Sequence, residues 1–389
     1  MHEIPKGWKV KKLGEICILD KGKIENCGEL PYLEVKFLRN LKNADIKEKG
    51  IVVEKNQAVI LVDGENSGEV FKVKTKGYLG STFRILKLSD NVNFDYFIFF
   101  MNFVSLKFKN SKVGSAIPHL NKKLFNECEI PLPNLVEQKA IVDKLDDSFA
   151  KIENAITNLI NAKENLKLYK QSVLKSAFNG DLLPNTSPTH WEVKKLGEIF
   201  NIVRGGSPRP IKSYLTDDKN GINWIKIGDI ETGSKYITHT KQKILASGLK
   251  KSRAVKAGDL LLTNSMSFGR PYISKINGAV HDGWLIFEPK IQISKDYVFY
   301  FFSSSDTYSK LSNLAVGSTV KNLQINFLEN FEIPLPPLSE QNLIVAEIDR
   351  RFAIVDKTLN LIDKSIQNAK NLKQSILKKA FSGELRSEI

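Results

Sequence analysis

The chain repeats one sequence pattern twice. Residues 5–16 (PKGWKVKKLGEI) return as residues 188–199 (PTHWEVKKLGEI), with nine of the twelve positions identical. Two further segments recur at a common offset of 203 positions: EIPLP at 129–133 and 332–336, and KQSVLKSAFNGDL at 170–182, which returns as KQSILKKAFSGEL at 373–385. The chain is therefore a tandem duplication, and any fold proposed for one copy must also suit the other.

The two copies agree at their ends and differ in their middles. The offset between matching segments grows from 183 to 203, so the second copy is 20 residues longer, with the gain in its middle part. PYLEVKF at 31–37 aligns only loosely with NWIKIGD at 223–229. Within one chain, this contrast indicates that the ends build a common scaffold and that the middles do two different jobs.

Each copy closes with a long segment of helical character. Apolar residues recur there every seven positions over five heptads, which is typical of a coiled-coil seam. A helix of ~40 residues would be ~60 Å long. The seam residues are Leu145, Ile152, Leu159, Leu166 and Val173 in the first copy and Ile348, Val355, Ile362, Ala369 and Ile376 in the second.

A second row of positions completes the predicted seam. In the first copy it comprises the residues four positions earlier, which include the small side chains Ser148, Ala155 and Ala162. Small residues favour close approach of helices, and matching copies favour pairing of the two helices with each other. The alternative is that each helix packs only against its own domain. The full second row is Ile141, Ser148, Ala155, Ala162 and Tyr169, with Phe352, Leu359 and Ile366 in the second copy.

Capping residues set the expected helix ends. Asn134 can cap the first helix, with Glu137 reaching back as in a capping box. Pro337 replaces that Asn in the second copy, so Ser339 is the expected cap there. Gly180 and Gly383 stand where a left-handed residue ends a helix.

The middles carry short β-rich runs broken by Gly and Asn, each followed by one aromatic helical stretch, at 95–108 and 296–311. This pattern predicts the α+β class, with two similar globular domains. The expected boundaries are 1–133 for the first domain, 134–180 for the first long helix, 181–336 for a linker and the second domain, and 337–389 for the second long helix.

Net charge favours a polyanionic partner. The formal net charge is +15, and 13 of these charges fall in residues 1–133 and 190–336, outside the long helices. A general excess of basic residues would raise the net charge of the long helices as well. The concentration of positive charge in the middles therefore favours nucleic acid as the partner. Lys-rich faces would hold phosphates, while a few Arg, Asn, Gln and Ser side chains reach base edges.

Catalytic and metal-binding patterns find little support. Asp20, Glu34 and Lys36 only loosely imitate the carboxylate set of a metal-dependent nuclease, and Lys226 replaces Glu34 in the second copy. The sequence contains no Gly-rich phosphate-binding motif and no zinc spacing among its five His. His281-Asp282 resembles an acid–base pair, but the matching residues are Gly80-Ser81, so a loop feature is expected.

Three Cys without C-x-x-C spacing predict neither a disulfide framework nor a zinc site, and fit a reducing cytoplasm. The start of the chain has no apolar leader. The longest apolar stretch, 96–106, falls short of the ~20 residues that a membrane span needs. A cytoplasmic protein is therefore expected.

Three repeated elements together resemble a known family. They are the W-x-V-K-K-L-G-E-I start, the I-P-L-P-x-x-x-E-Q element before each long helix, and the K-Q-S-[VI]-L-K-x-A-F-x-G-[DE]-L close. Their combination, over essentially the whole chain, is similar to the DNA specificity subunit of type I restriction-modification systems.

The resemblance implies a non-catalytic subunit with two target recognition domains, each of which reads one half of a bipartite, asymmetric DNA site. It further implies that the two long helices form an antiparallel coiled coil that fixes the gap between the half-sites. Two adenine methyltransferase subunits, joined by restriction subunits, are the expected protein partners. No cofactor is expected in this chain, and S-adenosylmethionine is expected on the methyltransferase subunits.

Candidate DNA contacts are the basic and amide side chains of the variable middles. The second domain carries a Gly-rich basic turn, RGGSPRP at 204–210, where the first domain has KGKIENCGELP. Asn66 and Arg270 are expected on corresponding strand-connecting loops. The candidates are Lys36, Arg39, Asn66, Lys72 and Arg84 in the first domain and Arg204, Arg209, Lys212, Asn264, Ser265 and Arg270 in the second.

The repeated Trp and Glu-Gln positions have structural alternatives. Trp8 and Trp191 are interpreted as core anchors rather than stacking platforms for bases. Two roles remain open for the Glu-Gln pairs: support of the helix starts or docking of partner subunits. These residues are Glu137, Gln138, Glu340 and Gln341.

A second function class stays open at this point. The coiled coil could be the functional part of a protein-interaction adaptor, with basic lobes that bind DNA non-specifically. Such an adaptor would bind any duplex weakly and in a salt-sensitive way, whereas a sequence reader would select an asymmetric two-part site.

Overall fold

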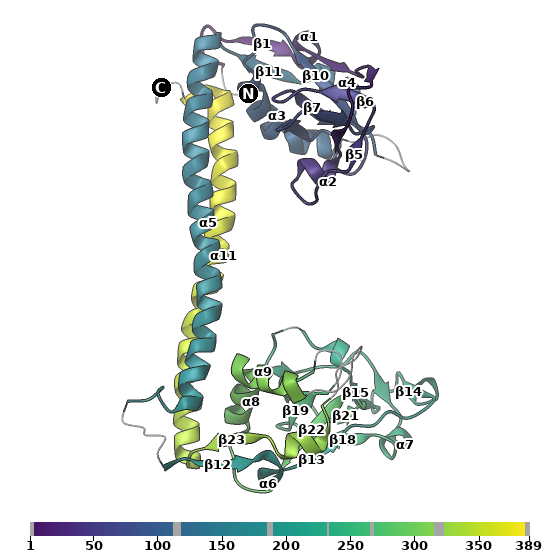
Figure 1. Cartoon of the computed structure of the whole chain (residues 1–389), viewed down its shortest axis with the longest axis vertical. Helices are drawn as coiled ribbons and strands as arrows, with labels where there is room; N and C mark the ends of the chain where they lie inside the picture. Colours follow the sequence, from purple (N-terminus) through teal and green to yellow (C-terminus); the bar gives the residue numbers. More distant parts are fainter. Residues whose placement is uncertain are drawn as a thin grey trace. The chain divides into compact units, whose positions relative to one another are not determined.

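The computed structural model describes residues 4–111, 118–184, 190–231, 233–264, 268–314 and 323–385. The chain divides into two compact units. The first comprises Met1–Ile160 with Asp363–Ile389, and the second comprises Asn161–Ile362. Each unit holds one globular domain and part of both long helices (Figure 1).

In the first unit, a two-stranded antiparallel ribbon joins the two ends of the globular domain. It pairs β1 (Lys9–Lys12) with β11 (Glu129–Leu132), the W-x-V-K-K and E-I-P-L segments of the repeat. A four-stranded antiparallel sheet follows in the order β2-β10-β7-β8. Its strands are β2 (Cys17–Asp20), β10 (Phe83–Leu88), β7 (Ala58–Leu61) and β8 (Val70–Lys72).

A second, five-stranded sheet of the first domain has the order β3-β6-β9-β4-β5. β4 and β9 run parallel, with Tyr32 opposite Tyr78. The strands are β3 (Ile24–Glu25), β6 (Gly50–Val53), β9 (Gly77–Leu79), β4 (Leu30–Leu33) and β5 (Ile46–Lys47). The helices of this domain are α1 (Leu13–Ile16), α2 (Val35–Leu38), α3 (Phe94–Lys109) and α4 (Lys122–Glu127).

The second unit repeats this plan. Its ribbon pairs β12 (Glu192–Lys195) with β23 (Glu332–Leu335), in the same register as the first. One sheet has the order β13-β22-β19-β20-β16 and the other β14-β17-β15-β21-β18. The first of these sheets contains β13 (Phe200–Arg204), β22 (Trp284–Pro289), β19 (Leu260–Thr263), β20 (Pro271–Ser274) and β16 (Tyr236–Ile237). The second contains β14 (Leu215–Thr216), β17 (Lys243–Ile244), β15 (Ile222–Ile225), β21 (Gly278–Val280) and β18 (Arg253–Val255).

The extra length of the second copy adds edge structure around a shared core. β14 and β16 lie at sheet edges and have no counterpart in the strand orders of the first domain. Shared strands keep their pairing: β15 runs parallel to β21, with Trp224 opposite Ala279, as β4 does to β9. The predicted α+β class and internal repeat are therefore confirmed, with the variation concentrated at the edges.

Helical prediction for the second domain needs one correction. The stretch expected as a single helix over 296–311 forms two, α8 (Lys295–Ser303) and α9 (Ser305–Leu314). Ser304 separates them, and its hydroxyl accepts a hydrogen bond from Thr307 N at 3.2 Å. An N-cap residue is favoured at such a break, and periodicity alone did not reveal it. The short helices α6 (Leu196–Ile199), α7 (Ala246–Leu249) and α10 (Ile325–Glu329) complete the domain.

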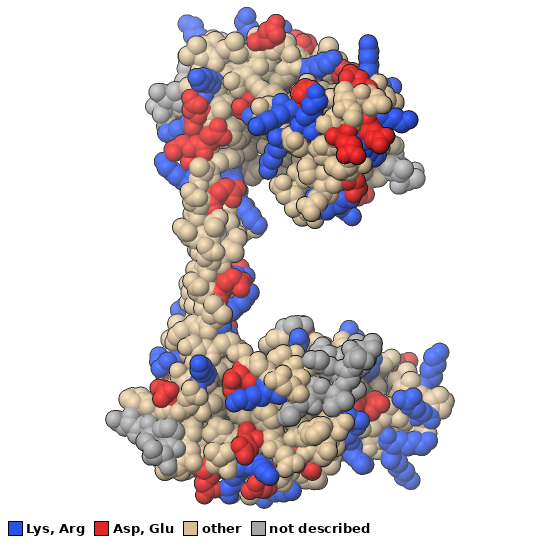
Figure 2. Space-filling model, in the orientation of Figure 1, with Lys and Arg blue, Asp and Glu red and all other residues tan. Residues whose placement is uncertain are grey.

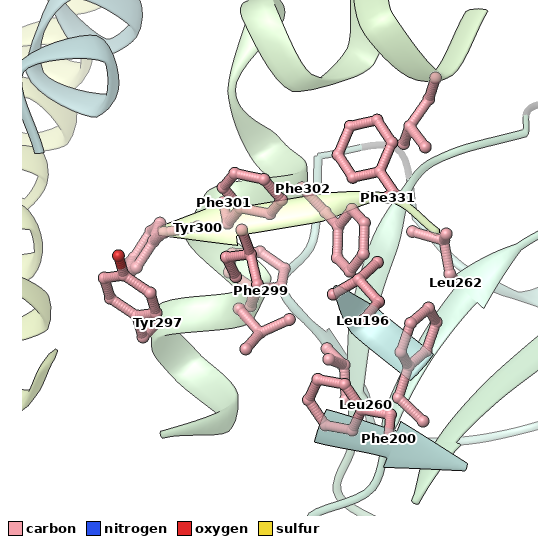
Figure 3. Packing of buried hydrophobic residues seen from close by; sticks show 14 of the residues in the cluster. Leu196, Phe200, Leu260, Leu262, Tyr297, Phe299, Tyr300, Phe301, Phe302 and Phe331 are labelled. Atoms are coloured by element: carbon pink, nitrogen blue, oxygen red, sulfur yellow. The ribbon is translucent and has the colours of Figure 1, made fainter. Parts of the chain in front are cut away.

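Aromatic residues of α8 fill the core of the second domain (Figure 3). Tyr297, Phe301 and Phe302 belong to one buried cluster with Leu196 of the repeated start and with Phe200, which follows it. Burying a large aromatic side chain stabilises a fold by roughly 2–3 kcal/mol. The aromatic stretch therefore anchors α8 to the sheet, as α3 is anchored in the first domain.

The long helices are α5 (Leu135–Asn179) and α11 (Leu338–Ser382), each of 45 residues. They run antiparallel in both units. Lys170 pairs with Asp356 in the second unit, and Lys373 pairs with Glu153 in the first. These pairs occupy equivalent repeat positions, and each lysine also lies over a Phe ring of the opposite helix, Phe352 or Phe149.

The predicted seam row is confirmed as the inward row. Leu145, Ile152, Val173, Ile348, Val355 and Ile362 are buried, and Leu159, Leu166 and Ile376 are half-buried.

The second row in the first copy was misplaced by one position. Ala155 and Tyr169 are exposed, whereas Phe149 and Ile156 face inward. The true spacing alternates four and three residues, as in the second copy, where Phe352, Leu359 and Ile366 are half-buried. The prediction placed the small residues Ser148, Ala155 and Ala162 in the seam. The helix instead buries the face that carries the large apolar side chain of Phe149.

Each long helix ends in the core of the domain built from the other copy. Phe381 of α11 packs against Tyr96, Phe100 and Phe103 of the first domain, with ring centroids 5.2–5.5 Å apart. Its repeat equivalent Phe178 of α5 packs against Tyr297 and Phe301 of the second domain. The repeated K-Q-S-x-L-K-x-A-F segment is therefore the piece that completes the opposite domain.

Helix ends agree with the predicted caps at Asn134, Gly180 and Gly383. The Asn134 side chain accepts from Glu137 N at 2.9 Å, and Gly180 and Gly383 have φ of +83° and +81°. Ser339 lies inside α11, which begins at Leu338, so its predicted cap role is wrong. The Glu137 carboxylate accepts from Trp8 Nε1 at 2.9 Å.

Within the described ranges, none of the helices combines the length and apolar character required to cross a membrane.

Candidate nucleic-acid interface

The RGGSPRP segment of the second domain leaves the sheet at the end of β13. Gly205 N and Gly206 N donate to the carbonyls of Trp284 and Val280. A Cβ on Gly205 would lie 2.1 Å from the carbonyl oxygen of His281, so only glycine allows this close approach. The two glycines therefore press the start of the segment against the β21–β22 loop and direct the following residues outward.

A groove of about 1060 Å³ opens beneath this segment. Its walls combine apolar side chains, including Trp224 and Ile227, with three cationic ones, and residues within 207–212 and 224–228 contribute most of the lining. A mostly apolar cleft with few convergent polar groups is typical of a ligand site. The cations are Arg209, Lys212 and Lys226, and the other polar side chains are Ser207, Gln242, His281 and Asp282.

Asp282 fixes the outer part of the segment. Its carboxylate accepts from the Ser207 hydroxyl at 2.8 Å and lies 3.7 Å from the Arg209 guanidinium. Partial burial raises the pKa of Asp282, but the Ser207 hydroxyl, a backbone N–H, His281 and Arg209 outweigh it and leave the pKa below its usual range. Asp282 therefore stays ionised, and the groove keeps a positive balance with three cations against one carboxylate.

His281 is part of the groove wall. Burial lowers its pKa, which keeps the imidazole neutral near pH 7. Its Nε2 lies 3.2 Å from Ile227 N, so the ring connects the β21–β22 loop to the helical turn after β15. The interpretation of His281-Asp282 as a loop feature fits this geometry, since both side chains bind neighbouring segments of the same wall.

Lysine and arginine side chains gather over the end of the second domain that carries β14 and α7 (Figure 2). A second hollow of about 440 Å³ adjoins the groove there and shares Leu215 and Gln242 with it. Lys241 and Lys243 line this hollow. The inserted edge structure of the second copy thus presents a continuous, cation-rich surface.

The structure divides the predicted contacts of the second domain. Arg209 and Lys212 line the groove, and Arg204 at the end of β13 is exposed. Arg270 is exposed on the β19–β20 loop, which corresponds to the β7–β8 loop that holds Asn66. Ser265 lies outside the described residues.

Asn264 does not face a ligand. Its side chain is 2% exposed, and its Oδ1 accepts from Leu323 N at 3.0 Å. Its own N–H donates to Gly283 O. Asn264 thus holds the β19–β20 loop in place, and its prediction as a base contact is not supported.

In the first domain, most predicted cations are already paired. Arg39 donates to Glu69, and Lys72 lies 2.5 Å from Asp95. Arg84 donates to the carbonyl of Phe83 at 2.6 Å. Lys36 is exposed on α2, and no ion pair is recorded for it in the described part of the chain. Lys36 therefore remains a candidate contact, whereas Arg39 would have to leave its partly buried pair with Glu69 to bind a phosphate.

Lys72 has an architectural role. It pairs with Asp95 of α3 next to Asp146 of α5, whose pKa is raised by burial and by the Asp95 charge. In the second unit, Lys235 lies 2.6 Å from Asp296 and 3.9 Å from Asp349, the repeat equivalents of the same two acids. The acid pair is repeated, but the lysine comes from a different variable segment in each copy.

In the first domain, Tyr78 ties down the segment that corresponds to RGGSPRP. Its hydroxyl accepts from Cys27 N at 2.8 Å and lies within hydrogen-bond distance of the carbonyls of Gly28 and Glu48. The repeat equivalent is Ala279, which has no polar group to tie the segment down. The corresponding segments are therefore held to their sheets in different ways, through the Tyr78 hydroxyl in the first domain and through Gly205 and Gly206 in the second.

The Glu-Gln pairs belong to the helix starts. Gln138 is buried, and its amide accepts from Asn93 N at 2.7 Å and donates to the carbonyls of Asn91 and Pro133. Gln341 makes the equivalent bonds to Ser294 N and Pro336 O.

The glutamates of these pairs bind the repeated tryptophans. Glu340 accepts from Trp191 Nε1 at 3.1 Å, as Glu137 does from Trp8. Both rings pack on the domain cores, as expected of core anchors. Support of the helix starts is therefore the role that the geometry favours, and docking of partners through the buried glutamines is not supported.

Replacing Gln138 with Leu is expected to destabilise the first domain by about 1–3 kcal/mol, because Asn93 N–H and two carbonyls lose their buried partner. Urea unfolding of the variant measures the loss. Gln341→Leu should act equally on the second domain, and Gln292→Leu, at an exposed position, should cost far less. Equal stability of all three variants would contradict the assignment.

No metal site forms from the nuclease-like set. Asp20 pairs with Lys87, and Glu34 pairs with Lys42. Among the described residues, no group of three or more His, Cys, Asp or Glu side chains is arranged to hold a metal ion.

Comparison with known proteins decides the family. The model of the type I restriction modification DNA specificity domain matches residues 5–162 and again residues 188–369. The chain belongs to this family. Both matches begin at the repeated Trp segment and extend into a long helix, so the family unit coincides with the internal repeat.

Named relatives of the family match along nearly the whole chain. The MjaVIII specificity subunit of Methanocaldococcus jannaschii is 30% identical over 99% of this chain and 95% of its own length. The EcoDI specificity subunit of Escherichia coli is 24% identical over 99% of this chain and 90% of its own. The adaptor alternative finds no support among these relatives.

Solved structures share the fold. One of them matches with a TM-score of 0.76 at 20% identity, over 98% of this chain and 99% of that one. It is described as showing complex assembly and conformational transition of the type I restriction-modification system. The HsdS subunit of Thermoanaerobacter tengcongensis matches with a TM-score of 0.61 at 20% identity, over 98% of both chains. The specificity-domain fold with its paired helices is thus common to proteins of low sequence identity.

Proposed function

We propose that this chain is the non-catalytic DNA-reading subunit of a type I restriction-modification complex. Each globular domain reads one half of a bipartite, asymmetric site, and the two long helices set the gap. The observation that carries the proposal is the cation-rich groove of the second domain, which lies in the segment where the two copies differ most. Family membership supplies the class of ligand.

The two domains offer different surfaces to DNA. The second presents a groove with Arg209, Lys212 and Lys226, whereas in the first the corresponding segment is tied to Tyr78. Unlike surfaces on a common scaffold suit two unlike half-sites, because base readout depends on the side chains in the groove while phosphate contacts set position.

Partners follow from the same proposal. Two adenine methyltransferase subunits and the restriction subunits would carry the chemistry, with S-adenosylmethionine bound to the methyltransferase subunits. The family relatives are named specificity subunits, which supports recognition rather than catalysis as the role of this chain. Cytoplasmic location is the expected setting for such a DNA-binding complex.

Exchange of residues 190–336 for the corresponding segment of another family member tests independent reading. The expected result is a new sequence in one half-site, with the other half-site and the gap unchanged, because the ribbon and helix ends that hold the segment are common to both copies. Selection from a randomised duplex library, or mapping of methylated bases in the host genome, measures both halves. A change in both half-sites would contradict the proposal.

A further inference from the structure

Lys226 holds the side chain of Gln242 at the mouth of the groove in the second domain. Lys226 Nζ donates to Gln242 Oε1 at 2.8 Å. An ammonium group only donates hydrogen bonds, so the amide must turn its oxygen towards Lys226. The NH₂ group of Gln242, with two N–H donors, is then directed away from the lysine.

Asp229 anchors this lysine from inside the domain. Its carboxylate lies 4.0 Å from Lys226 Nζ, and its side chain is only 3% exposed. The Oδ2 atom has no hydrogen-bond partner in the described part of the protein. A buried carboxylate favours a nearby cation, so Asp229 attracts Lys226 and biases it, and through it the Gln242 amide, towards one orientation.

Gln242 is also well placed to meet a ligand. It is exposed and lines both the groove and the adjoining hollow, while its backbone is fixed by the bond from Trp224 N to Gln242 O at 2.9 Å. A rigid backbone and an oriented amide on a cation-lined wall are the properties of a base-reading side chain.

We propose that Gln242 is a specificity-determining residue that reads a guanine through the paired acceptors of its major-groove edge, with Lys226 as its positioning residue. Guanine presents two acceptors, O6 and N7, whereas adenine presents N7 beside an N6–H₂ donor. To read adenine, the Gln242 oxygen would have to accept from the N6–H₂ group, and it would then lose its hydrogen bond from Lys226. The inference rests on the proposed function and specifies the chemistry of one of its contacts.

Gln242→Glu in the full-length chain, assembled with its host's modification subunits, tests the readout on a randomised duplex library. The variant is almost isosteric, but a carboxylate only accepts hydrogen bonds. The expected result is a change of preference at one position of one half-site from guanine to cytosine, because the N4–H₂ group of cytosine donates hydrogen bonds. The ratio of affinities for the two bases should shift by about 10-fold or more. The other half-site and the gap should stay unchanged.

Lys226→Met tests the positioning role. Without the lysine, the Gln242 amide can adopt both orientations, so adenine should become nearly as acceptable as guanine at the same base pair. Lys212→Met removes the same charge from the same groove and should weaken binding to all sequences alike, with no change in base preference. Gln292→Glu, at an exposed position outside the groove, should leave selection unchanged.

Two failures remain distinguishable. If the unmodified chain selects no two-part sequence, the proposed function fails. If it does select one, but Gln242→Glu lowers affinity equally for all sequences or leaves the preference intact, the assignment of Gln242 alone is overturned. Thermal unfolding of each variant shows that the second domain is folded in both cases.

Discussion

Replacing Phe381 with Ala is expected to lower the free energy of unfolding of the first domain by about 3–5 kcal/mol. Phe381 lies near the end of the sequence, whereas the rest of this domain comes from the first 133 residues. The ring fills a space between Tyr96, Phe100 and Phe103, and its removal leaves a cavity in the core of the domain. Loss of stability on this scale approaches the total for many domains.

Hydrogen exchange resolves which domain is affected. Amides of the buried strand β7 should lose protection in Phe381→Ala, while those of the equivalent β19 keep theirs. The matched variant Phe178→Ala should show the reverse pattern, because Phe178 packs on Tyr297 and Phe301. Equal loss in both domains from either variant would contradict the exchange of helix ends between the copies.

Removing one heptad from each long helix is expected to abolish binding to the original site, by 10³-fold or more, on the scale that separates specific from non-specific binding. Deletion of residues 158–164 and 362–368 shortens each helix by about 10 Å. The variant should select the same two half-sites with a gap shorter by about three base pairs, at 3.4 Å per pair.

The deletion is placed so that the pairing of the helices is preserved. Lys170 and Asp356 remain on one side of the cut, and Glu153 and Lys373 remain on the other. Whole heptads also keep the inward row inward. As a control, deletion from α5 alone should destabilise the coiled coil. This variant should bind none of the sites, whatever the length of the gap between the half-sites. Unchanged gap selection by the double deletion would show that the helices do not set it.

Sequence periodicity was sufficient for the architecture. The duplicated ends predicted two similar α+β domains and two long helices, because apolar spacing and glycine at helix ends act locally. The heptad row from Leu145 to Val173 was right for the same reason. The predicted second row of the first copy was wrong. Ile141 and Val142 are adjacent and both are buried, so the sequence did not show which of the two positions begins the row.

The candidate site was predicted only in part. Arg209 and Lys212 were identified by the unusual Gly-rich basic turn, and both line the groove. Lys226 and Gln242 were missed, because one follows β15 and the other precedes β17, and they form a pair only when these strands lie side by side. Asn264 was a plausible contact in a loop, yet its environment buries it.

By itself, the sequence determined that the chain is duplicated, which segments are common, and where the excess positive charge lies. The tertiary structure alone decided which copy completes which core: Phe178 and Phe381 stand in closely similar local sequences, and each packs in the domain of the other copy. Local patterns specify helices and strands, because their interactions span a few residues. Long-range contacts depend on the antiparallel course of α5 and α11, which no short segment records.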